Sequence, residues 1–164
     1  MKKLRLFDAV LEFSNLLVAA LLVGAMFGLW LSLNPSGLDA ATYIGQQQLS
    51  IRALNVPMPL LGGLTLLLTI IAAVFARSDR PRFAILVVAA ICLLAAGLIT
   101  RFLNQPINAI VINWSVNAPP PEWMQLRDSW WQWHIARLGF GICALSLLIA
   151  ATMKRGRSSV STTG

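Results

Sequence analysis

Long apolar runs without a single charged side chain limit what this chain can fold into. A helix needs roughly 17–25 mainly apolar residues to cross a bilayer, and the chain has four charge-free runs near or above that length. They are Phe13–Leu38, Val56–Ala76, Phe83–Thr100 and Leu138–Met153. The fourth is slightly short unless its helix begins earlier, which would carry His134 and Arg137 into the membrane. Only 12% of the residues are charged, against about 25% in soluble domains. We therefore predict an all-α integral membrane protein, a four-helix bundle.

The four runs predict one membrane domain. We expect it to cover residues 1–157, with short helical segments in its two longer loops, Asn34–Asn55 and Gln105–Gln132. The expected spans are about 14–33, 58–76, 83–104 and 131–153. The tail, residues 158–164, is polar and rich in small residues, so it is expected to be disordered.

The positive charges are arranged by topology. The net charge is +7, and most Lys and Arg residues fall at span ends that an even number of spans places on one side. They are Lys2, Lys3, Arg5, Arg77, Arg80, Arg82, Lys154, Arg155 and Arg157. The positive-inside rule then places both termini in the cytoplasm and the two longer loops outside. A nucleic-acid site would need a basic patch on one polar surface, so we exclude nucleic acid as a partner. Short loops without a sorting signal favour a bacterial inner membrane.

The cysteines and the histidine do not form a metal or redox motif. Cys92 and Cys143 lie deep in predicted spans without a CxxC spacing, which favours a packing role. This argues against a disulfide-generating enzyme coupled to quinone, since such chemistry needs an accessible thiolate. One histidine and two isolated thiols are too few ligands for a zinc site, so no metal is expected.

The stretch Thr100–Arg137 holds most of the unusual polar chemistry, including five of the 6 tryptophans and the 1 histidine. Continuing the third helix into this stretch places Arg101, Asn104 and Asn108 on one face. Pro106 falls inside the same run and is expected to kink or end the helix.

A second polar stripe is predicted at the start of the fourth helix. Arg127, Trp130, His134, Arg137 and Gly141 fall on one helical face. Charged residues at membrane depth normally face the bundle interior and are paired. We therefore expect the two stripes to approach each other at the outer ends of spans three and four.

The outward side has more positive than negative charge. Its carboxylates are Asp39, Glu122 and Asp128, and its arginines are Arg52, Arg101, Arg127 and Arg137. This surplus suits an anionic or electron-rich ligand, such as a phenolate, an enolate, a quinone oxygen or a lipid phosphate. An alternative stays open, because tryptophans also form interfacial belts, arginines near helix ends reach toward headgroups, and a lone histidine is often structural.

The motif T-R-F-L-N-Q-P-I-N-A-I-V-I-N-W, followed by W-M-Q-L-R-D-S-W-W-Q-W-H-I-A-R, resembles the anthrone oxygenase-like family of small four-span membrane proteins. The resemblance is specific over about Thr100–Arg137 and looser over the first long loop. The family pattern falls on Asn104, Pro106, Asn108, Trp114, Arg127, Trp130 and Arg137.

This resemblance implies a cofactor-independent oxygenase of phenolic substrates, which in some members converts anthrones to anthraquinones. On that hypothesis His134 is the candidate base, because its ordinary pKa lies near neutrality, and Arg127 or Arg137 stabilises the enolate or superoxide charge. Asn104 and Asn108 would orient the oxygens of the substrate, and Trp130 would stack on its ring. The remaining substrate-binding candidates are Arg101 and Arg52.

The competing interpretation is a protein without catalysis that binds a lipid, a quinone-like molecule or a partner helix. Membrane lipids are expected partners on either interpretation. Gly24 and Gly28 form a small-xxx-small pair that lets helices approach closely, within the bundle or in a homo-oligomer.

Overall fold

The structure is built from helices that follow the apolar runs. The computed structural model describes residues 2–160. Its elements are α1 (Lys2–Ser32), α2 (Ala40–Leu54), α3 (Pro57–Phe75), α4 (Arg80–Ile99), the π-helical turn η1 (Thr100–Asn104), α5 (Gln105–Val111) and α6 (Trp123–Val160). The described residues contain no strand, which confirms the all-α prediction.

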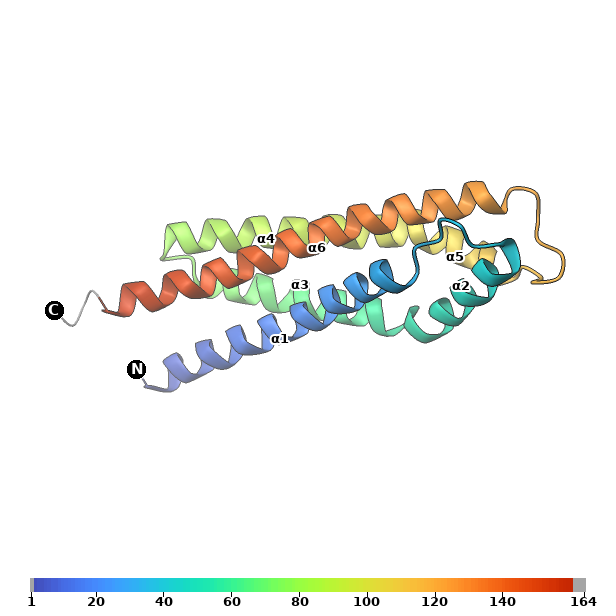
Figure 1. The fold of residues 1–164 in the computed structure, drawn as a ribbon. Coiled ribbons are helices and arrows are strands. Elements are labelled where there is room, and N and C mark those ends of the chain that lie inside the picture. The colour runs from blue at the N-terminus through green and yellow to red at the C-terminus, as the bar shows by residue number, and fades with distance from the viewer. Residues whose placement is uncertain (1, 161–164) are drawn as a thin grey trace.

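The four long helices form a bundle in which each packs against two others. α1 contacts α3 and α6, and α4 contacts the same two helices. Figure 1 shows both chain ends at one end of the bundle, with α2 and α5 at the other. Four helical segments are long and apolar enough to cross a membrane, so the predicted integral membrane bundle is confirmed.

The short helix α2 begins at an N-cap. The Asp39 carboxylate accepts hydrogen bonds from the Thr42 backbone N–H at 3.0 Å and from the Thr42 hydroxyl at 2.7 Å. These bonds favour the ionised carboxyl, so they hold the pKa of Asp39 below its ordinary value. α2 then lies against α3 and α5 and covers the end of the bundle opposite the termini (Figure 1).

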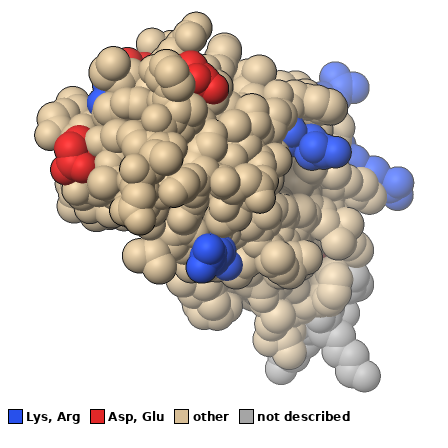
Figure 2. Space-filling view, turned by 90° about the vertical axis from the view of Figure 1, so that its right-hand side faces the viewer, with Lys and Arg blue, Asp and Glu red and all other residues tan. Residues whose placement is uncertain are grey.

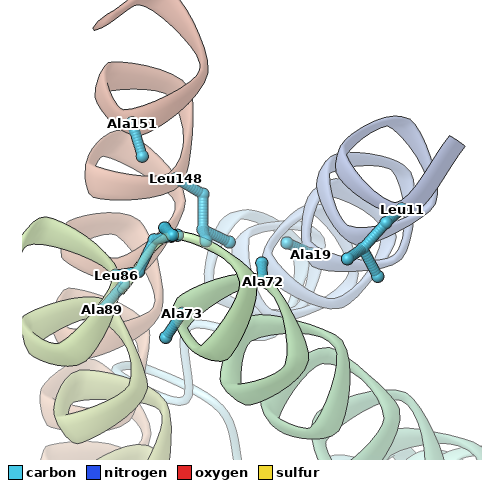
Figure 3. Packing of buried hydrophobic residues seen from close by; sticks show 9 residues of the cluster. Leu11, Ala19, Ala72, Ala73, Leu86, Ala89, Leu148 and Ala151 are labelled. Atoms are coloured by element: carbon cyan, nitrogen blue, oxygen red, sulfur yellow. The ribbon is translucent and has the colours of Figure 1, made fainter. Parts of the chain in front are cut away.

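Small residues bring the long helices together near the terminus-bearing end. Buried alanines from all four helices meet there (Figure 3): Ala19 of α1, Ala72 and Ala73 of α3, Ala89 of α4 and Ala151 of α6. Lipid is as apolar as these side chains, so membrane helices associate through close packing and hydrogen bonds.

Two polar pairs add to this packing. The Asn15 amide of α1 exchanges hydrogen bonds with the Thr69 hydroxyl of α3 at 3.2 Å. Arg82 of α4 forms an ion pair with Glu12 of α1. Both pairs fix α1 against helices that are distant in sequence.

Pro106 was expected to kink or end its helix. The structure instead has a π-helical turn just before the proline. The backbone N–H of Gln105 donates to the carbonyl of Thr100, five residues back, and the π-helical turn η1 leads directly into α5. Pro106 stands in the first turn of α5, where a missing N–H is tolerated. The extra residue in the turn thus accommodates the proline while the helix continues to Val111.

Helix α6 is longer than the expected fourth span. It begins at Trp123, so its first turns lie before residue 131, and it runs to Val160. Residues 158–160 of the tail expected to be disordered are therefore helical, and residues 161–164 lie outside the described residues.

Candidate functional site

The centre of the candidate site is a buried pair of side chains on α6. The Nδ1 atom of His134 lies 2.9 Å from Nη2 and 3.2 Å from Nε of Arg137. Since a guanidinium only donates, Nδ1 is the acceptor. The other ring nitrogen, Nε2, lies 3.1 Å from the carbonyl oxygen of Met26 on α1, to which it donates. His134 is thus a neutral imidazole with both nitrogens engaged.

The position of His134 depends on how closely α1 approaches α6. Gly141 lies two turns further along α6, and a Cβ atom there would stand 2.5 Å from Cε of Met26. A larger residue at this position would force the end of the Met26 side chain to move. The approach brings the Met26 carbonyl to the imidazole, whose exposed fraction is 0%.

Two tryptophan rings lie nearly parallel to the imidazole of His134. The Trp130 ring stacks on it at 5.1 Å between centroids with an angle of 5°, and the Trp131 ring does so at 5.6 Å and 18°. Stacking on the two tryptophan rings holds the His134 ring in one orientation. The hydrogen bonds to Nδ1 then fix the position of the Arg137 guanidinium.

Arg137 is a buried cation without an acidic partner. Its exposed fraction is 7%, and no ion pair joins it to a carboxylate that the structure describes. Its remaining neighbours are Thr100, whose Oγ1 lies 3.5 Å from Nη1, and the Trp130 ring, 5.8 Å from Cζ. Placing an uncompensated charge at membrane depth is costly, so this arrangement favours an incoming anion.

Arg137 lines a large cavity between the helices. Its volume is about 490 Å³, within the range of small-molecule sites. The polar lining residues are Asn55, Thr100, Arg101, Gln105 and Arg137. The apolar wall comes from α1, α3, α4 and α6, and includes Leu22, Met26, Met58, Leu66, Leu93 and Leu94. The cavity therefore offers a long apolar surface with polar groups that include a cation.

The cavity opens on the outer face of the bundle between α3 and α4. Gly63 of α3 and Gly97 of α4 both line it and both are exposed. No heavy atom lies within 4 Å of a Cβ built at either position. In a membrane this opening faces lipid, so an apolar molecule can enter without crossing water.

The predicted asparagines hold the two stripes together. The Asn104 amide donates to the Trp130 carbonyl at 3.0 Å, and the Asn108 oxygen accepts from Nε1 of Trp130 at 2.8 Å. Gln47 of α2 lies 3.4 Å from the same Asn108 oxygen. The stripes thus approach each other as expected, and α5 and α2 are fixed to α6 at Trp130.

The structure separates Arg127 and Arg52 from this pair, whereas Arg101 lines the same cavity as Arg137. Arg127 forms an ion pair with Asp128 at 2.8 Å and lies 4.9 Å from the Trp123 ring, and it does not line the large cavity. Arg52 is exposed on α2 and does not line that cavity either. Arg101 is exposed and does line it. The end that carries α2 and α5 is mostly uncharged, with acidic residues toward one side (Figure 2).

Several contributing groups were not among the predicted site residues. Thr100 and Gln105 border the cavity beside Arg137, and both stand in the motif that carries the resemblance. Asn55 follows α2 and borders it as well. The Met26 carbonyl had no sequence signal, because a backbone atom in an apolar helix carries none.

The described part of the chain offers no metal site, and its two cysteines lie close together. Among the described side chains, no group of three His, Cys, Asp or Glu residues is arranged to hold a metal ion. Cys92 of α4 and Cys143 of α6 do meet, with sulfurs 3.8 Å apart, a contact that their sequence spacing does not predict.

Comparison with known proteins agrees with the motif. A family model described as anthrone oxygenase matches residues 48–147, which is more than half of the chain. No curated protein and no solved structure matches it. The matched region runs from α2 to α6 and includes Asn104, Asn108, Trp130, His134 and Arg137.

Proposed function

The chain belongs to the anthrone oxygenase family, and from this premise we propose that it oxygenates a flat phenolic substrate in the cavity between α1, α3, α4 and α6. The observation that carries the proposal is Arg137, a buried guanidinium without an acidic partner among the described residues, placed on the wall of an apolar cavity. A fused aromatic ring fits the apolar wall, and its ionised oxygen fits the cation.

The substrate is proposed to react as its anion. An opposite charge nearby favours the ionised form of an acid, so Arg137 lowers the pKa of a bound phenol or enol. Described lining residues include neither a carboxylate nor a free imidazole, so the proton is proposed to leave to water.

Dioxygen is the oxidant in the proposed reaction. The enolate carbon gives one electron to O₂, and the resulting radical and superoxide combine to form a C–O bond. Protonation gives a hydroperoxide, whose O–O bond breaks as the remaining C–H proton is lost. A methylene group and O₂ thus become a carbonyl group and water. Arg137 stabilises the anionic species along this route, as preorganised cations do.

His134 is proposed to position Arg137 rather than to act as the base. Its Nδ1 lone pair accepts from Arg137, its Nε2–H is held by the Met26 carbonyl, and the ring is fully buried. Asn104, Asn108 and Trp130 are proposed to hold the helices around the pair. Arg101 is proposed to attract the anion at the cavity wall, while Arg127 and Arg52 have no contact with the cavity.

A second candidate function is binding without turnover. The cavity opens toward lipid and is mainly apolar, so a lipid with an anionic headgroup or a quinone would find the same complementary surface. Dioxygen consumption separates the two functions, because only the oxygenase uses it.

We propose the orientation that the positive-inside rule predicts, with the terminus-bearing end in the cytoplasm of a bacterium and the protein in its inner membrane. The loop between α3 and α4, which carries Arg77, lies at the same end as the termini (Figure 1).

The test is oxygen uptake by the purified protein in detergent with 1,8-dihydroxyanthrone as probe. We expect uptake above the spontaneous rate, with the anthraquinone and water as products, and loss of that excess in Arg137→Gln. Arg127→Gln is the matched control, because Arg127 lies outside the cavity, and it should keep the excess. Equal rates for wild type, Arg137→Gln and buffer would overturn the oxygenase proposal.

A further inference from the structure

Two smaller cavities continue from the large one toward the α2 end. A middle cavity of about 40 Å³ shares Asn55, Thr100, Gln105 and Arg137 with the large cavity. An outer cavity of about 10 Å³ shares Gln47 and Trp130 with the middle one. Its other lining residues come from α2 and the connection between α1 and α2: Leu33, Pro35, Leu38, Tyr43 and Gln46. The three cavities therefore form a row from Arg137 to just beneath that connection.

The lining of the middle cavity has a larger polar share than that of the large cavity, whereas the outer cavity is lined mainly by apolar surface. Polar side chains line the middle cavity on several sides: Gln47, Ser50, Asn55, Thr100, Gln105, Asn108 and Arg137. A water molecule needs about 10–15 Å³ and two to four polar partners. The outer cavity thus has room for about one water and the middle cavity for a few.

Tyr43 provides an independent sign of water in the row. Its exposed fraction is 3%, it lines the outer cavity, and its hydroxyl has no hydrogen-bond partner among the described residues. Burial raises the pKa of Tyr43 well above its ordinary value, so the group stays a neutral donor and acceptor. A buried hydroxyl without a partner is costly, and a water in the outer cavity would satisfy it.

Gln47 stands where the outer and middle cavities meet. It lines both, its exposed fraction is 3%, and its Nε2 lies 3.4 Å from Oδ1 of Asn108. That oxygen already accepts the shorter bond of 2.8 Å from Trp130. The long contact leaves the Gln47 amide free to bond to water on either side.

We propose that this row is a hydrated path for water and protons between the α2 end and Arg137, with Gln47 at its narrowest point. Apolar ligands have the separate opening between α3 and α4. The use of the path rests on the proposed function, since oxygenation releases a proton from the substrate and then a water. The path itself rests only on the cavities, on Tyr43 and on Gln47.

Hydration can be measured without a substrate, by brief X-ray irradiation of the protein and mass spectrometry of the side chains that hydroxyl radicals modify. Trp130 and Met58 line the middle cavity and are 4% and 8% exposed. After each rate is divided by the intrinsic reactivity of that side-chain type with hydroxyl radical, we expect both to be modified faster than the core residues Leu86 and Leu148, which are 3% and 2% exposed. Gln47→Leu should lower the modification of both several-fold and leave Met153, which is 68% exposed, unchanged.

Two variants keep this test decisive. Gln125→Leu makes the same change at an exposed position of α6 outside the three cavities, and it should behave as wild type. Tyr43→Phe removes one oxygen atom and should lower the modification of Trp130 even if Gln47→Leu does not fold. Modification of Trp130 and Met58 at the same reactivity-corrected rate as the core leucines would overturn the path, and so would rates unchanged in both cavity variants. Neither result depends on oxygen uptake, so the proposed function stands or falls separately.

Discussion

Nδ1 of His134 lies 2.9 Å from Nη2 of Arg137, and that nitrogen is the closest hydrogen-bond acceptor that the structure gives this buried guanidinium. A neutral imidazole orients a cation without neutralising it. The charge is therefore held in place at the cavity wall and remains available to an anion. This relationship predicts how the protein responds to changes at either residue.

Replacing Arg137 with methionine should weaken ligand binding and strengthen the fold. A buried charge without an acidic partner destabilises the folded state, and replacing buried ionic groups with apolar residues of similar volume can stabilise a protein by roughly 1–4 kcal/mol. Thermal unfolding in detergent, without ligand, should show a higher melting temperature for Arg137→Met than for wild type. A clearly lower melting temperature would mean that Arg137 stabilises the packing of the helices.

Replacing His134 with glutamine distinguishes a role as catalytic base from a role in positioning Arg137. The side chain of His134→Gln can accept from Arg137 and donate to the Met26 carbonyl, so a positioning role predicts substantial turnover with a modest rise in KM. His134→Phe lacks both groups and should lose roughly 30-fold or more in kcat/KM, in the range of removing one partner of a buried charged hydrogen bond. Equal inactivity of the two variants would instead identify His134 as the base.

The opening between α3 and α4 can be closed from Gly97. A Cβ built there meets no heavy atom within 4 Å, so Gly97→Phe should fold while its ring covers the cavity mouth. The affinity for an aromatic ligand, measured by fluorescence quenching of the tryptophans, should fall by about 10-fold or more. Gly139→Phe is the control, because Gly139 is equally open but does not line the cavity. Unchanged affinity in Gly97→Phe would place the ligand entrance elsewhere.

The stability of the first turn of α2 should decrease at low pH, when its N-cap residue Asp39 becomes protonated. The pKa of Asp39 is lower in the folded protein than its ordinary value of 3.8, so its contribution is complete above that value and is lost as the pH falls through the folded pKa. Hydrogen exchange of the first-turn amides of α2, corrected for intrinsic rates, should accelerate below about pH 4 in wild type. Asp39→Asn should show little of this acceleration. Identical pH profiles for the two proteins would contradict the cap.

Much of the architecture could be predicted from the sequence, because the bilayer imposes length and polarity on every span. The stripe of Trp130, His134 and Arg137 could also be predicted, since helical spacing alone places these residues on one face. The π-helical turn could not, because Pro106 indicates only that a backbone bond is lost and not where the helix adjusts. The engagement of His134 by the Met26 carbonyl was equally hidden, since it depends on how closely α1 approaches Gly141.

The separation of Arg127 from Arg137 has a similar cause. Both lie on the predicted stripe, but helical spacing does not say which neighbours each residue meets. Arg127 pairs with Asp128 near the start of α6, whereas Arg137 lies beside Thr100 of the π-helical turn. The packing of α4 and α5 on α6 distinguishes the half-buried Arg127, which has an acidic partner, from the buried Arg137.

The central claim is that Arg137 binds the anionic form of an aromatic ligand, and a spectrophotometric titration of bound 1,8-dihydroxyanthrone under argon tests it most directly. The absorption of the probe reports its ionisation, and the absence of dioxygen prevents turnover. With wild-type protein the probe should ionise at a pH about one unit or more below its value with Arg137→Gln, while Arg127→Gln should match wild type. An identical ionisation midpoint with wild type and Arg137→Gln would contradict the account.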